Sequence, residues 1–187
     1  MGYSKFQCLV VGFLFTLSTF GSIAESADAQ KTYQGDFHYL IGDLSDSWSR
    51  SDYDRFYLVA KNLSEKGIRT VIHVDAKTWD LKNTLTDPLA VGIIWNSHGS
   101  KNGSIWDADE KRLPRGLFAR KATDKLRYVL FANCYGQASI HYYGLDQLPE
   151  VFSKGWPGDV SSEMLFHYLF SQQFERDLKT AMSNSLR

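Results

Sequence analysis

Four short runs of apolar residues, rich in β-branched and aromatic side chains, stand out between residues 37 and 132. They lie at residues 37–41, 70–74, 91–96 and 128–132, and their composition predicts β-strands. The runs are continuously apolar rather than alternating, which indicates strands buried on both faces, as in a parallel sheet covered by helices. The sequence therefore predicts an α/β fold, a three-layer sandwich with a mostly parallel sheet.

Apolar residues between and after these strands recur at helical spacing. Residues 51–66 carry one apolar stripe made of Tyr53, Phe56, Ala60 and Leu63, which predicts a helix. Ser51 is its expected N-cap, and Gly67 follows its end. Further helices are expected at residues 78–84, 115–125 and 159–182, the last capped by Asp159 or Ser161, and a hairpin is expected at 107–112.

The first 29 residues have the layout of a secretory signal peptide. Lys5 precedes an uncharged apolar run at residues 8–20, and small residues follow. Cleavage after Ala24 or after Ala29 fits the pattern; with the second, which we prefer, residues 30–187 form one domain. Because the apolar run is short for a bilayer span, we expect a secreted or periplasmic protein without stable membrane insertion. The alternative is an uncleaved anchor.

Removal of this segment changes both the charge and the cysteine count. It takes one lysine and two acidic residues from a chain with 21 Lys and Arg and 21 Asp and Glu. The resulting net charge of about +1 implies no nucleic-acid partner. It also takes Cys8, so Cys134 is the only cysteine of the mature chain. An unpaired thiol in an oxidising compartment is a candidate reactive group; the alternative is a buried cysteine acting as a small hydrophobe.

Two of the predicted strands end in residues suited to nucleophilic catalysis. Residues 91–96 lead into His98 and Gly99, and residues 128–132 lead into Cys134. Functional groups gather at the carboxyl ends of parallel strands, so we expect His98 beside Cys134. A thiolate is a good nucleophile, and a nearby imidazole can act as general base and acid. The backbone N–H groups of Gly99 and Cys134 are the expected oxyanion hole.

This order of motifs resembles that of the caspase-like cysteine peptidases (clan CD), which include caspases, legumains, clostripains and gingipains. Members have an apolar strand ending in His-Gly and, after an insertion, an apolar strand ending in the nucleophilic cysteine. His98 and Cys134 stand in that order, 36 residues apart. The resemblance implies an endopeptidase that cleaves a peptide or protein substrate through an acyl-enzyme, with no cofactor. It also implies that Asp43, in the loop after the first strand, and Ala132 and Asn133 border the substrate.

The residues before Cys134 depart from that pattern. Ala132 stands where many members specific for basic residues have Asp, and Asn133 is larger than the Ala or Ser expected directly before the nucleophile. A catalytically silent caspase-like binding or scaffold domain of the cell envelope is therefore the alternative function. His38 and His73 alternate with apolar neighbours, which indicates structural roles. Since no His or Cys residues are grouped at zinc-site spacing, we expect no metal site.

Overall fold

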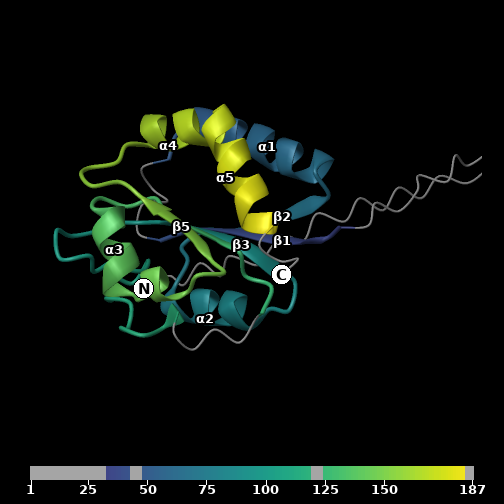
Figure 1. The fold of residues 1–187 in the computed structure, drawn as a ribbon. Helices are drawn as coiled ribbons and strands as arrows, with labels where there is room; N and C mark the ends of the chain where they lie inside the picture. Colours follow the sequence, from purple (N-terminus) through teal and green to yellow (C-terminus); the bar gives the residue numbers. More distant parts are fainter. Residues whose placement is uncertain (1–32, 43–47, 119–123, 184–187) are drawn as a thin grey trace, which may run out of the picture. The chain divides into compact units, whose positions relative to one another are not determined.

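A computed structural model of the chain describes residues 33–42, 48–118 and 124–183. Five strands form a parallel sheet in the order β2-β1-β3-β4-β5. They are β1 (Gly35–Ile41), β2 (Ile68–His73), β3 (Ala90–Asn96), β4 (Tyr128–Phe131) and β5 (Phe152–Gly155). Helices cover both faces of this sheet (Figure 1), so the predicted three-layer α/β sandwich is confirmed.

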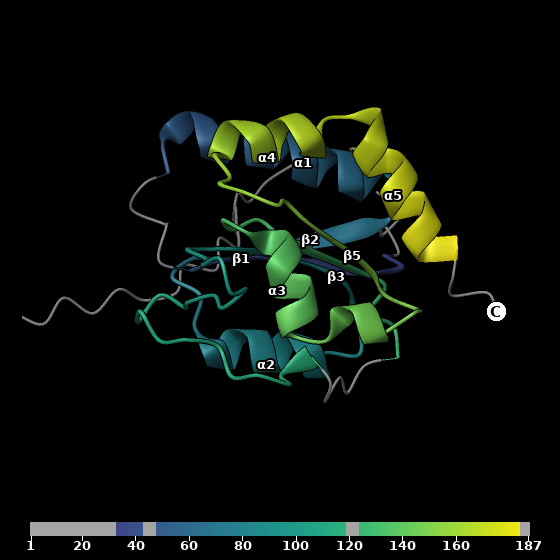
Figure 2. The ribbon, with the colours of Figure 1, turned by 60° about the vertical axis from the view of Figure 1, so that its left-hand side comes forward.

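The helices divide between the two faces of the sheet. One face carries α1 (Arg50–Glu65), α4 (Ser162–Leu169) and α5 (Gln172–Ser183), and the other carries α2 (Thr78–Thr86) and α3 (Gly136–Tyr142) (Figures 1 and 2). A short 3₁₀ helix, Leu145–Gln147, follows α3. Within the described parts of the chain, no helix is long and apolar enough to cross a membrane. The expected signal peptide, residues 1–29, lies outside the described residues.

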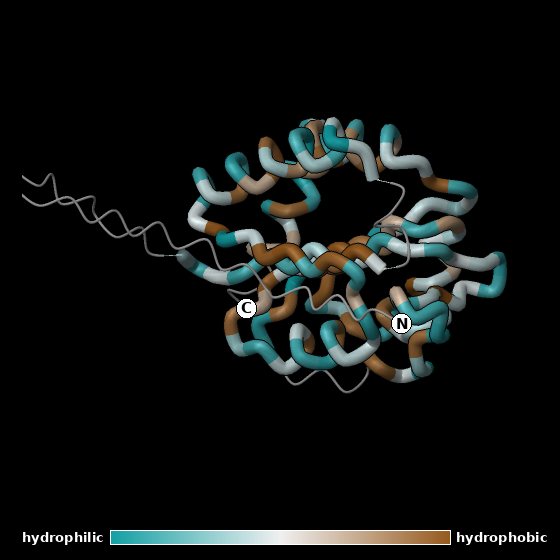
Figure 3. Tube along the Cα trace, turned by 180° about the vertical axis from the view of Figure 1, so that it is seen from behind, coloured by the Kyte–Doolittle hydropathy of each residue, from teal (hydrophilic) through white to brown (hydrophobic). Residues whose placement is uncertain are grey.

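Two apolar clusters, one on each face of the sheet, form the core. Side chains alternate along a strand, so Tyr39 of β1 packs with the residues of α1, α4 and α5, whereas Leu40 packs with those of α2. Figure 3 shows the mostly apolar strands between helices that mix apolar and polar positions. This two-sided burial explains why β1, β3 and β4 are mostly apolar, whereas β2, at the edge of the sheet, is only partly buried.

The first helix begins one residue earlier than expected. Its N-cap is Ser49 rather than Ser51, because Ser49 and Asp52 form a capping box. The Asp52 carboxylate accepts hydrogen bonds from the backbone N–H of Ser49, at 2.8 Å, and from its hydroxyl, at 2.7 Å. The buried stripe of this helix consists of Phe56, Val59 and Leu63.

Two expected helices in the later part of the chain need correction. The helix expected at residues 159–182 is two helices, α4 and α5, because the chain turns at Ser171, whose hydroxyl accepts the N–H of Phe174. The Ser161 cap is confirmed.

Of the helix expected at 115–125, residues 119–123 lie outside the described residues, and residues 115–118 form turns. The structure adds α3 and β5, while the bridge between Trp106 and Arg112 confirms the hairpin at 107–112.

Candidate active site

The backbone around His98 is held by buried side chains at the end of β3. The indole of Trp95 donates a hydrogen bond to the Ser97 hydroxyl at 2.7 Å, and that hydroxyl donates to the His98 carbonyl at 3.1 Å. Trp95 and Ser97 are buried, whereas the His98 side chain is exposed. The sheet thus presents an imidazole to solvent from a rigid support.

Cys134 follows β4, which is the direct neighbour of β3 in the sheet. Trp95 pairs with Phe131, and the N–H of Ala132 donates to the Trp95 carbonyl at 2.8 Å. His98 and Cys134 each come three residues after this matched pair. The Cys134 side chain is half-buried, so the thiol is partly accessible at the edge where His98 lies.

The segments that carry the two residues touch each other along their length. An ideal Cβ on Gly99 would lie 2.3 Å from the Cys134 carbonyl oxygen, so only glycine allows this approach. The Lys101 ammonium lies 6.0 Å from the centre of the Tyr135 ring. A Cβ on Gly103, which has a φ of +84°, would lie 2.4 Å from the carbonyl oxygen of Ala138 in α3. The residues predicted to react therefore stand on adjoining loops.

Two features of these loops fit a nucleophilic thiol with an oxyanion hole beside it. Neither the N–H of Gly99 nor that of Cys134 donates a hydrogen bond to another described residue. Directly after the thiol, Tyr135 adopts a left-handed conformation with a φ of 58°, which costs a residue with a side chain of the order of 1 kcal/mol. Sharp strand-to-helix turns that expose a nucleophile store strain of this kind.

Two of the three residues expected to border the substrate, Ala132 and Asn133, are buried. Ala132 is 3% exposed and Asn133 is 1% exposed, so neither side chain is accessible to a substrate. The Asn133 amide instead donates to the Cys134 carbonyl at 2.9 Å and to the Ser139 hydroxyl at 3.1 Å. Asn133 is thus a positioning residue that holds the Cys134 loop. Asp43 lies outside the described residues.

A cavity of about 510 Å³ lies next to this edge, beside β5 and α4. Trp156, Met164 and Tyr168 line it, together with Lys154 and Glu163. Its wall continues toward the Cys134 loop, because the Trp156 carbonyl accepts the N–H of Gln137 at 3.0 Å and the Gly158 carbonyl accepts that of Tyr135 at 2.8 Å. Neither His98 nor Cys134 lines the cavity itself.

A second group of ionisable side chains lies under α2 and was missed as a group in the sequence. It joins Asp36 and His38 of β1 to Asp87, which follows α2. The sequence signal was the spacing of Asp36 and His38, two residues apart on a strand and therefore on one face. The third member is distant in sequence, so only the fold shows the group.

The chain matches no known protein family, and no curated protein is significantly similar to it in sequence. The fold defines it as a parallel α/β three-layer protein, and its function has to be inferred from the site.

Proposed function

We propose that this chain is an exported, caspase-like cysteine endopeptidase, secreted or periplasmic, in which Cys134 is the nucleophile and His98 is the general base and acid. The observation that carries the proposal is the contact between Gly99 and the Cys134 carbonyl. This contact puts the residue after the imidazole against the residue that bears the thiol. The order of the two motifs along the chain supports the same reading.

The proposed reaction is acyl transfer in two halves. The Cys134 sulfur attacks the carbonyl carbon of the scissile peptide bond while His98 takes the thiol proton, and the tetrahedral oxyanion accepts hydrogen bonds from the N–H groups of Gly99 and Cys134. His98 then gives the proton to the leaving amine as the C–N bond breaks. In the second half, His98 removes a proton from water, which attacks the thioester, and returns it to the departing sulfur.

Several structural features support this division of roles. The hydrogen bonds from Trp95 through Ser97 fix the backbone of His98, and those of Asn133 fix the carbonyl of Cys134. The rate of a catalysed reaction falls steeply when the reacting groups are displaced by as little as about 1 Å. Such a reaction requires an accessible imidazole and thiol on a backbone that is held in place, and these buried hydrogen bonds hold it.

Cleavage of a peptide library by the purified chain tests the proposal. We expect Cys134→Ala to fold normally and to show no cleavage, and His98→Ala to lower the rate by about 10²–10⁴-fold, the usual contribution of general acid–base catalysis. His167→Ala is the matched control, because this exposed histidine lies on α4. Cleavage that persists in Cys134→Ala would eliminate Cys134 as nucleophile.

Alkylation with iodoacetamide tests the pair without a substrate. At pH 7 we expect Cys134 of the wild-type chain to react faster than that of His98→Ala, because the thiolate is the reacting form and the imidazole promotes it. His167→Ala should react like the wild type. Equal rates in all three proteins, together with no cleavage of any peptide, would favour the catalytically silent binding domain instead.

A further inference from the structure

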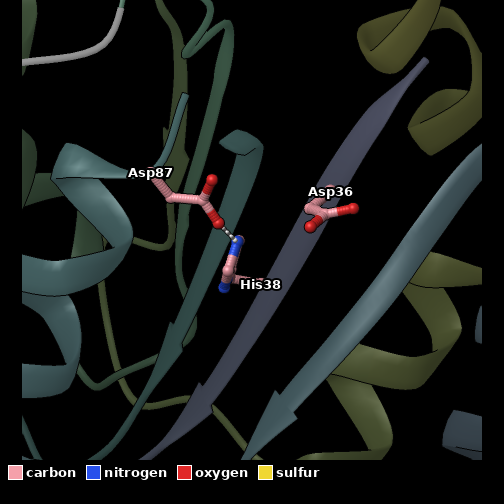
Figure 4. Close-up of side chains that lie close together, drawn as sticks. All are labelled: Asp36, His38 and Asp87. Atoms are coloured by element: carbon pink, nitrogen blue, oxygen red, sulfur yellow. Dashed lines mark ion pairs between the residues drawn. The ribbon is translucent and has the colours of Figure 1, made fainter. Parts of the chain in front are cut away.

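Four side chains under α2 form a row that crosses from helix to sheet and back. Asp87 Oδ2 lies 3.3 Å from His38 Nε2, and His38 Nδ1 lies 3.1 Å from His73 Nε2. His73 Nδ1 in turn lies 3.7 Å from Asp80 Oδ1. Figure 4 shows Asp87 reaching from the end of α2 toward the ring of His38 on β1.

His38 Nε2 approaches the Asp87 carboxylate to 3.3 Å without forming a hydrogen bond to it. His38 Nε2 is buried and forms no hydrogen bond with any described residue. His38 Nδ1 lies within hydrogen-bonding distance of His73 Nε2, at 3.1 Å, and of the Thr84 hydroxyl, at 3.4 Å. With its one hydrogen on Nδ1, the neutral His38 ring donates to one of these two partners. The lone pair of His38 Nε2 then faces the Asp87 carboxylate.

A lone pair facing a carboxylate in a buried place is repulsive unless a cation lies between them. Protonation of both His38 ring nitrogens would place a positive charge on a side chain that is only 5% exposed, which burial disfavours. A metal ion resolves the conflict, because it is bound by both groups at once. In a tetrahedral zinc site with ligand distances of about 2.0–2.1 Å, neighbouring ligand atoms stand roughly 3.3 Å apart. His38 Nε2 and Asp87 Oδ2 have that separation.

Asp36 supplies a third ligand from the same strand as His38. One ligand atom from each of Asp36, His38 and Asp87 lies within 4.8 Å of the other two. Arg69 donates to both oxygens of Asp36, and each oxygen keeps a second lone pair. We propose that Asp36, His38 and Asp87 form a binding site for a divalent transition-metal ion, best suited to zinc, contrary to the expectation from sequence.

The surrounding groups match what metal ligands need behind them. A ligating histidine usually donates its other ring N–H to a neighbour, which fixes its tautomer and orientation. His38 has that neighbour in His73, which Asp80 supports in turn, and Arg69 supports Asp36. Imidazole with carboxylate favours zinc and related ions over calcium or magnesium, which prefer oxygen ligands alone.

The site is separate from the proposed active site. Asp36 pairs with Ala90 at the start of β3, and β3 runs roughly 20 Å along the sheet before it reaches the edge that bears His98. The bound ion would fasten the end of α2 to the central strand. Its role is structural, and it goes beyond the proposed peptidase function.

Zinc binding to the full chain, measured by titration calorimetry, tests the site. The Cys134→Ala protein is used, so that zinc held by the proposed catalytic pair does not contribute. We expect one zinc ion per chain and, at a hundredfold excess over Kd, a rise in Tm of about 5 °C or more. Asp87→Asn, a nearly isosteric change at a partly exposed side chain, should weaken zinc binding by at least about 10-fold.

Asp146→Asn is the matched control, because Asp146 forms an exposed pair with His141 at 2.8 Å, a hydrogen-bonding distance. It should bind zinc like the parent. Cobalt bound in place of zinc should give the intense visible absorption of a low-coordinate site, lost in Asp87→Asn. Absence of zinc binding, an unchanged affinity in Asp87→Asn, or an equal Tm rise with magnesium would each overturn the proposal.

Discussion

Replacement of Gly99 by alanine tests the contact between the two reactive loops. The added Cβ would lie 2.3 Å from the Cys134 carbonyl oxygen and 2.2 Å from Nδ2 of Asn133, whereas ordinary contact begins at 3.4 Å. The first of these atoms is backbone and the second belongs to a buried amide, so neither can swing away freely. The loops must therefore separate by about 1 Å, in an interior that is packed as densely as a crystal. Overpacking of this kind costs about 1–3 kcal/mol.

Urea unfolding and alkylation of Cys134 measure the two consequences of that change. We expect Gly99→Ala to lower the free energy of unfolding by about 1–3 kcal/mol, as a lower midpoint with an unchanged m-value. A displacement of about 1 Å costs on the order of 100-fold in rate when reacting groups must be aligned. Peptide cleavage should fall by about that factor, and alkylation at pH 7 should slow.

Gly158→Ala is the matched control, because Gly158 lies in the neighbouring loop. A Cβ there meets nothing within 4 Å, and its φ is outside the left-handed region. Its free energy of unfolding should stay within about 0.5 kcal/mol of the wild type. If Gly99→Ala matched Gly158→Ala in unfolding and in alkylation, the two loops would not be in contact, and the support for a His98–Cys134 pair would be lost.

Two further predictions concern the helix cap and the buried histidines. Ser49→Ala should destabilise the protein by about 1 kcal/mol, because Ser49 caps α1; a larger loss in Ser51→Ala, measured by urea unfolding, would contradict this cap. In metal-free protein, burial and the neighbouring His73 lower the pKa of His38 below 6.5, so below that pH the unfolded chain binds more protons than the folded one. Stability measured with a chelator should therefore fall from pH 7.5 to 5.5, by no more than about 1.4 kcal/mol per pH unit from this residue, and a flat profile would refute the shift.

The central strands could be predicted from sequence because their signal is local. A strand buried on both faces is mostly apolar, as β1, β3 and β4 are. The four predicted runs lie within two residues of β1 to β4, and β2 is apolar enough to be predicted although it is a partly buried edge strand. The edge strand β5 is half-buried along its length and contains Ser153 and Lys154, so it lacks that signal. The cap of α1 was predicted at the wrong serine, because Ser49 and Ser51 are equivalent as residue types. Asp52 completes the capping box with Ser49.

The sequence by itself determined which residues could react and where along the chain they stand. His98 and Cys134 each follow an apolar strand, and that is visible without a fold. Only the tertiary structure decided their neighbourhood, because the pairing of β3 with β4 brings their loops into contact. It also turned Asn133 inward, since Ser139 on the following helix accepts its hydrogen bond.

Only the fold completes the histidine and carboxylate group under α2, because Asp87 is distant in sequence from Asp36 and His38. His38 and Asp87 come from different elements, and neither has a local pattern that marks a ligand. Local composition selects strands and helices, because burial acts on each residue where it stands. Which side chains meet is set by strand order and helix packing, which depend on interactions between residues far apart in the chain.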